Sequence, residues 1–199
     1  TNWKDRLGYR KNPRLDEPSN WNRRQRLAFE EGQRMAEQDG MTWIVHIDSD
    51  ELLYGKDPAE VFGRHPWSNA FHFWNEEVAP EKFNHQNCFK ECTKFHEDPA
   101  NFMAYGNGKS AGRVGKCTWN GPHYFKEKSV EVPPEDLRVL HYPACNLEEF
   151  AKRKQRYGNF TDASGTWADK HVAMRETDDL ESLFARRFPG PDAKEIRVM

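Results

Sequence analysis

The feature that most constrains the fold is an amphipathic helix followed directly by a short apolar strand. Between Trp21 and about Gln38 the apolar residues recur at helical spacing, and Gly40 ends the helix. Residues 42–47 then form a short, mostly apolar run, typical of an interior strand covered on both faces. A helix that leads into such a strand is half of a βαβ unit. We therefore predict an α/β domain with a mixed, mainly parallel sheet flanked by helices.

The rest of the chain contains shorter elements of both kinds. The patterns predict helices over 58–62, 147–156 and 178–187, and strands over 70–74 and 137–142. The stretch 79–116 is rich in polar residues and glycine, so we expect it to be irregular apart from short strands. We expect an irregular segment over 1–20, the main domain over 21–160, and a C-terminal helical segment over 161–199 that packs on it.

Composition excludes several classes of protein. Aromatic residues make up 13% of the 199 residues, which argues against disorder. The formal net charge is −2 and basic runs are short, so we expect no nucleic-acid partner. We also expect no transmembrane segment, because apolar runs are too short to cross a bilayer. The chain begins at Thr1 rather than Met, and we expect a processed or truncated piece, with a cytoplasmic or a lumenal location left open.

The cysteines leave their chemistry open. The four are Cys88, Cys92, Cys117 and Cys145. Cys88 and Cys92 are four residues apart, but no second close pair completes a zinc site, so the spacing is only a weak indication of metal binding. Free thiols and one or two disulfides are equally compatible with this pattern.

Three carboxylates lie directly after the strand at 42–47. They are Asp48, Asp50 and Glu51. In an extended segment Asp48 and Asp50 point the same way, and two carboxylates on one side suit Mg²⁺ or Mn²⁺. Such an ion can bridge the phosphates of a nucleoside diphosphate and neutralise charge on a leaving group. The competing interpretation is a polar loop that caps the strand.

The run from Trp43 to Leu53 resembles the D-x-D-E segment of family-2-like glycosyltransferases of the GT-A type. Further pieces match that family in order: Asn22-Arg23-Arg24-Gln25, Gly108-Lys109-Ser110 with Arg113, Asn120-Gly121-Pro122-His123, and Leu140-His141-Tyr142. The resemblance covers roughly residues 20 to 156. It implies a GT-A fold and the transfer of a sugar from a nucleoside-diphosphate donor to a hydroxyl of a glycan or glycoconjugate, assisted by Mn²⁺ or Mg²⁺.

The resemblance also implies roles for individual residues. Asp48, Asp50 and His141 would hold the metal and the donor diphosphate. Residues implied to lie near the donor or the acceptor are Arg24, Gln25, Lys109, Arg113 and His123. Trp74 could stack on an acceptor sugar, although a core position is the commoner case. Inversion, the expected outcome, needs a carboxylate base. Glu76 and Glu77 follow the strand at 70–74 and are the best-placed candidates, and of the two Glu77 is preferred. If configuration is retained, neither need be a base.

One departure from the family pattern leaves alternatives open. GT-A enzymes usually begin with βα units that bind the nucleotide, whereas only some twenty irregular residues precede the first helix here. Either an N-terminal portion or a partner chain supplies that part, or nucleotide binding is compromised. A non-catalytic glycosyltransferase-like subunit is thus the main alternative. A phosphatase of the haloacid-dehalogenase type is disfavoured by Leu52 at its Thr/Val position and by the absence of a Gly-Asp dipeptide.

Overall fold

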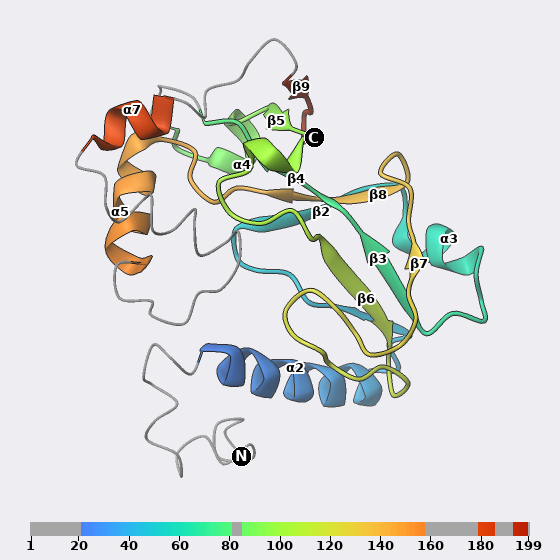
Figure 1. Ribbon diagram of the computed structural model, residues 1–199. Coiled ribbons are helices and arrows are strands. Elements are labelled where there is room, and N and C mark those ends of the chain that lie inside the picture. The colour runs from blue at the N-terminus through green and yellow to red at the C-terminus, as the bar shows by residue number, and fades with distance from the viewer. Residues whose placement is uncertain (1–20, 81–84, 158–178, 186–192, 199) are drawn as a thin grey trace. The chain divides into compact units, whose positions relative to one another are not determined.

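The computed structural model describes residues 21–80, 85–157, 179–185 and 193–198 (Figure 1). The segment predicted to be irregular, 1–20, lies outside these residues, as does much of 161–199. The described residues form two compact units, and each is considered by itself. Unit 1 contains the described residues up to Asp48 together with Gly55–Phe73 and Gly108–Leu137, and unit 2 contains Ser49–Tyr54, Trp74–Asn107 and the described residues from Arg138 onward. The predicted boundaries at 160 and 161 stay predictions.

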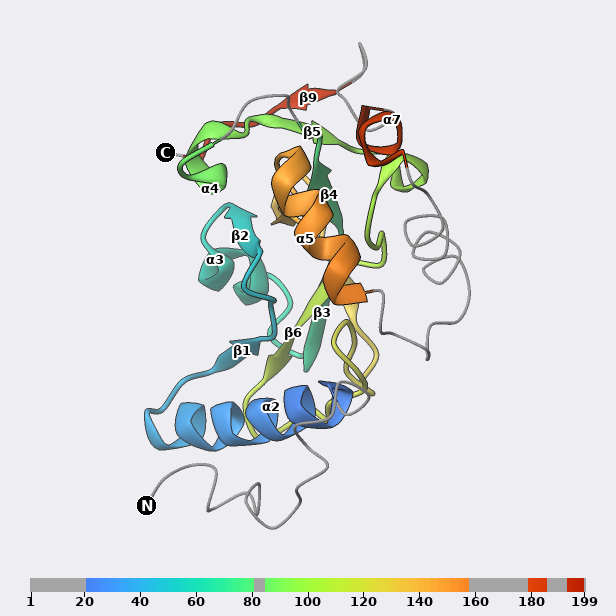
Figure 2. The same cartoon turned by 90° about the vertical axis from the view of Figure 1, so that its left-hand side faces the viewer.

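Unit 1 is a four-stranded sheet with two helices. Its elements are α2 (Trp21–Gln38), β1 (Trp43–Val45), α3 (Pro58–Gly63), β3 (Ala70–Phe73), β6 (Lys109–Arg113) and β7 (Val130–Glu131). The strand order is β1-β6-β3-β7, in which β6 pairs antiparallel with both β1 and β3 while β7 runs parallel to β3. Figure 2 shows α2 lying against this sheet. The contact is apolar, because Phe29 of α2 packs with Ile44, Ala70 and Phe125.

Unit 2 is a five-stranded sheet with short helices. Its elements are β2 (Glu51–Gly55), β4 (Asn75–Val78), α4 (Cys88–Glu91), β5 (Lys94–His96), the 3₁₀ helix η4 (Pro99–Asn101), β8 (Leu137–His141), α5 (Leu147–Tyr157), α7 (Leu180–Ala185) and β9 (Lys194–Glu195). The strand order is β2-β8-β4-β5-β9. β4 and β8 are parallel, whereas β5 pairs antiparallel with β4 and β9. None of the described helices is long and apolar enough to cross a membrane.

The α/β class with mixed sheets flanked by helices is confirmed, but two details of the prediction are wrong. β1 is an edge strand with half-buried residues, not an interior strand. Parallel pairs do not predominate, because β6 enters the sheet beside β1 and runs antiparallel to both of its neighbours. An apolar run reveals burial but not the side on which a partner strand pairs, so the sequence could not locate the edge.

The position of β6, an interior strand of unit 1, was not predicted. β6 lies in the stretch expected to be largely irregular, yet its first four residues are buried. Its sequence, Lys109-Ser110-Ala111-Gly112-Arg113, shows no apolar alternation, so no strand pattern is visible. Gly112 is required by packing, since a Cβ there would lie 2.5 Å from the Sγ of Cys117. The strand is buried because it pairs on both sides, which is a tertiary effect.

Candidate functional site

Neighbouring strands of unit 2 bring three predicted site residues together. Glu77 of β4 is in register with His141 of β8, and the carbonyl of Asp50 accepts a 2.8 Å hydrogen bond from the Tyr142 amide. As a result the His141 ring lies between two carboxylates. Its Nε2 is 3.6 Å from Asp50 Oδ2, and its Nδ1 is 3.3 Å from Glu77 Oε2. We call Asp50, His141 and Glu77 the His141 triad.

The two sides of the His141 triad differ in their access to solvent. The Glu77 side chain is 1% exposed and that of Asp50 is 37% exposed. Burial by itself lowers the pKa of His141, but the hydrogen bonds and negative charges of Asp50 and Glu77 outweigh burial and raise this pKa to about 9. The imidazole is thus held by a buried carboxylate on one side and faces a solvent-accessible carboxylate on the other.

Glu77 is fixed by the backbone as well as by His141. Its carboxylate accepts hydrogen bonds from the amides of Met103 and Ala104, the latter at 3.0 Å to Oε2. Glu76 points elsewhere, because successive residues of a strand face opposite ways. Its carboxylate pairs with Arg138 and lies 3.7 Å from the Nζ of Lys194. The two carboxylates predicted as alternative bases therefore have different surroundings.

The donor atoms of the His141 triad suit a hard divalent cation. A histidine that ligates a metal commonly uses its other ring nitrogen to contact a carboxylate, which fixes the ring orientation. His141 has this arrangement, with Glu77 at Nδ1 and with Nε2 directed at Asp50. Carboxylate oxygen and imidazole nitrogen are both ligands of Mn²⁺, and carboxylate oxygen is the usual protein ligand of Mg²⁺. The residues therefore fit the predicted ion.

In unit 1 the structure brings Asp48 together with two other predicted residues. Lys109 Nζ lies 2.7 Å from Asp48 Oδ2, and the Gln25 amide donates a 3.3 Å hydrogen bond to Asp48 Oδ1. The Lys109 side chain is 0% exposed, whereas that of Asp48 is 33% exposed. A buried ammonium requires a nearby carboxylate to compensate its desolvation. Asp48 therefore balances Lys109 and still presents part of its carboxylate to solvent.

Two histidines of unit 1 have lowered pKa values. His123 Nδ1 lies 2.8 Å from the carbonyl oxygen of Gly108. Burial lowers the pKa of His123 to about 4, and the positive charge of Lys109 adds to this effect. Burial and Lys109 likewise lower the pKa of His46. Neutral imidazoles beside a buried lysine avoid accumulating positive charge there.

We expect His123 to make the folded state sensitive to acid. Between about pH 6.5 and about pH 4 the unfolded chain binds a proton on His123 that the folded chain does not bind. Stability therefore falls as the pH is lowered through this window, by up to about 3 kcal/mol for this single group. His123→Asn, which keeps a donor for Gly108 O, should reduce the slope of unfolding free energy against pH in urea titrations. An unchanged slope would contradict the assignment.

The remaining predicted residues are Arg113, Arg24 and Trp74. Arg113 donates hydrogen bonds to the carbonyl oxygens of Pro66 and Ser68, and its guanidinium lies 4.4 Å from the centre of the Trp43 ring. Arg24 is half-buried near the start of α2. Trp74, between β3 and β4, is 45% exposed, so its indole is accessible to a ligand. Substrate binding by these three residues stays a prediction.

Some groups around the site could not be found from the sequence. The amides of Met103 and Ala104 hold Glu77, but backbone donors carry no signal in the residue pattern. His46 lies within the strand predicted at 42–47, but its closeness to Lys109 depends on β6, whose position was not predicted. The pairing of Glu77 with His141 depends on the register of two strands about sixty residues apart in the chain.

Comparison with known proteins supports a relationship to one class. No protein-family model and no solved structure matches the chain. It is similar to two proteins of Arabidopsis thaliana, "Glycosyltransferase-like At3g57200" (28% identity over 168 residues, 68% of this chain and 32% of that protein) and "Glycosyltransferase-like At2g41451" (25% identity over 168 residues, 68% and 37%). The chain spans about a third of the length of these curated relatives. The chain is therefore related, at low identity, to proteins named glycosyltransferase-like.

Proposed function

We propose that this chain is part of a metal-dependent glycosyltransferase that moves a sugar from a nucleoside-diphosphate donor to a hydroxyl of a glycan or glycoconjugate. The observation that carries the proposal is the His141 triad, in which Asp50 and His141 offer an oxygen and a nitrogen ligand and Glu77 fixes the imidazole. The relationship to glycosyltransferase-like proteins supports the same class.

Asp50 and His141 would hold Mn²⁺ or Mg²⁺, and Asp48 stays a further predicted ligand. When bound, the ion would neutralise charge on the departing diphosphate. His141 supplies its Nε2 to this site, and Asp50 is exposed enough for a ligand to reach it. Lys109 would keep the Asp48 carboxylate oriented through their 2.7 Å contact.

Glu77 is better suited to position His141 than to act on the acceptor. A general base must lie within hydrogen-bond reach of the hydroxyl that it deprotonates. Glu77 is buried, and its carboxylate accepts the Met103 and Ala104 amides while it contacts His141. Glu76 is engaged by Arg138. We therefore propose Glu77 as a positioning residue, and its role as the base stays a prediction.

The decisive experiment measures metal and donor binding in turn. Mn²⁺ binding is followed by electron paramagnetic resonance, and UDP- and GDP-sugars are then titrated calorimetrically with Mn²⁺ or with EDTA. We expect donor binding that requires Mn²⁺, and we expect Asp50→Asn to weaken Mn²⁺ binding at least tenfold, the lower end of what loss of metal-site contacts costs.

Asp98→Asn provides the matched control. Asp98 is an exposed carboxylate of unit 2 that caps η4 through the Ala100 amide, and asparagine also caps well. The Asp98→Asn variant should bind Mn²⁺ and the donor as the parent chain does. Equal Mn²⁺ binding by Asp50→Asn and the parent would remove Asp50 from the site. A folded parent chain that binds neither Mn²⁺ nor donor would overturn the proposal in favour of a non-catalytic glycosyltransferase-like subunit.

A further inference from the structure

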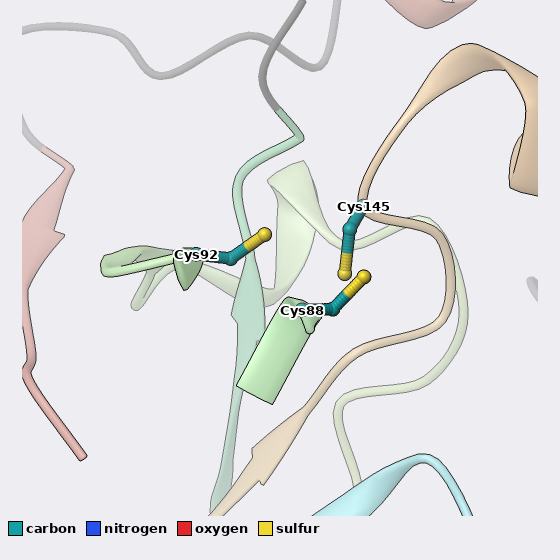
Figure 3. Close-up of side chains that lie close together, drawn as sticks. All are labelled: Cys88, Cys92 and Cys145. Atoms are coloured by element: carbon teal, nitrogen blue, oxygen red, sulfur yellow. The ribbon is translucent and has the colours of Figure 1, made fainter. Parts of the chain in front are cut away.

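We propose that Cys88, Cys92 and Cys145 of unit 2 bind one Zn²⁺ ion. These three residues, here the cysteine cluster, turn their sulfur atoms toward one another (Figure 3). All three Sγ atoms lie within 4.8 Å of one another, and no disulfide joins them. From the sequence alone this site was only weakly indicated, because Cys145 lies far along the chain from the other two.

The spacing of the sulfurs suits tetrahedral zinc. With Zn–S bonds of about 2.3 Å, two thiolates of a tetrahedral site lie about 3.8 Å apart. The observed separations of at most 4.8 Å thus need to close by no more than about 1 Å, which small side-chain rotations can provide.

The backbone fixes the cluster from two directions. Cys88 begins α4 and Cys92 ends its single turn, where the Cys92 amide donates a 3.0 Å hydrogen bond to the Cys88 carbonyl oxygen. A spacing of four residues places both side chains on one face of this turn. Cys145 comes from the segment between β8 and α5. An ion bound by all three would tie α4 to that segment.

A buried hydroxyl provides independent support. Tyr142 packs in the same hydrophobic cluster as Cys92 and Cys145, and is 5% exposed. Its hydroxyl is buried and makes no hydrogen bond within the described part of the chain. Leaving such a group without a hydrogen bond is unfavourable. A metal-bound thiolate, or a water in the fourth coordination position, would accept a hydrogen bond from the Tyr142 hydroxyl. Groups around metal sites commonly make such hydrogen bonds.

The ligand type selects the metal. Thiolates are soft ligands that favour zinc over the Mg²⁺ or Mn²⁺ proposed for the His141 triad. A disulfide is a poorer account of the cluster, because pairing any two of the cysteines would leave the third thiol beside the bond without a role. The zinc proposal does not depend on the proposed transferase activity.

The test is metal content and cobalt spectroscopy on the whole chain, purified under reducing conditions. We expect one Zn²⁺ per chain by mass spectrometry and, after exchange with Co²⁺, a thiolate-to-cobalt charge-transfer band with the intensity of three thiolates. Cys88→Ser and Cys145→Ser should each lose the zinc and at least a third of that band. Cys117→Ser is the matched control, since Cys117 is a buried cysteine of unit 1; it should keep both.

Three results would overturn the proposal: a folded parent chain without Zn²⁺ or Co²⁺ affinity, a disulfide between two cluster cysteines in the reduced preparation, or equal metal loss in Cys117→Ser. If the cluster variants do not fold, the Co²⁺ spectrum of the parent decides. A band of three-thiolate intensity supports the site, and a band of one-thiolate intensity excludes it.

Discussion

Glu77→Ala is expected to destabilise unit 2 by about 3–5 kcal/mol, the cost of removing one partner from a buried charged pair. The change leaves the Met103 and Ala104 amides without their carboxylate and takes the buried partner from His141. These lost hydrogen bonds are part of that cost, because each buried group left unsatisfied is worth about 1–3 kcal/mol. Urea unfolding, followed by circular dichroism at pH 7, measures the loss.

Glu97→Ala is the control for loss of a carboxylate in the same unit. Glu97 is exposed and pairs with Lys194, whose Nζ lies 2.8 Å from Glu97 Oε1. Removing the Glu97 carboxylate should therefore change the free energy of unfolding by less than about 1 kcal/mol. Glu77→Gln should fall between the two, because its amide retains one oxygen acceptor. If Glu77→Ala unfolds at the same urea concentration as Glu97→Ala, the buried network does not stabilise unit 2 in solution.

Gly55→Ala is expected to destabilise unit 1 by about 3 kcal/mol or more. Gly55 has a φ of 137°, which L side chains rarely adopt, and a Cβ there would clash with the carbonyl oxygen of Asp136 and lie 3.1 Å from the Cα of Leu137. That carbonyl accepts a 2.7 Å hydrogen bond from the Lys56 amide, so it cannot move away freely. Backbone strain of about 1–2 kcal/mol adds to an overpacking cost of about 1–3 kcal/mol.

Gly40→Ala separates the two contributions. Gly40 also has a positive φ, 68°, but a Cβ there meets nothing within 4 Å. Only the strain remains, so the expected loss is about 1 kcal/mol. Thermal unfolding of both variants beside the parent gives the comparison. Equal losses at the two glycines would mean that the close approach of Gly55 to Asp136 is absent in solution.

The His141 triad shows how a functional site can be foreseen in its residues but not in its contacts. Asp50, His141 and Glu77 were each singled out from the sequence, for motif position or for following a strand. Their arrangement was not foreseen, because it depends on the parallel register of β4 and β8. In that register Glu77 lies beside His141. The contacts therefore favour a role for Glu77 in positioning His141 over a role as a catalytic base.

The sequence by itself determined the elements whose signals are local. The helix over Trp21–Gln38 was predicted with the ends that the structure shows, and α3, β3, β8 and α5 were predicted to within one or two residues. Periodicity, glycine and proline act over a few residues, so they can be recognised without a partner.

Only the tertiary structure decided which segments pair. It made β1 an edge strand, placed the polar β6 at the centre of a sheet, and brought Cys145 to Cys88 and Cys92. Lys109 illustrates the cause: nothing in the sequence marks it as buried, but it is fully buried because β6 pairs on both sides and Asp48 compensates its charge. Such burial arises from contacts between residues far apart in the chain, for which local patterns carry no signal.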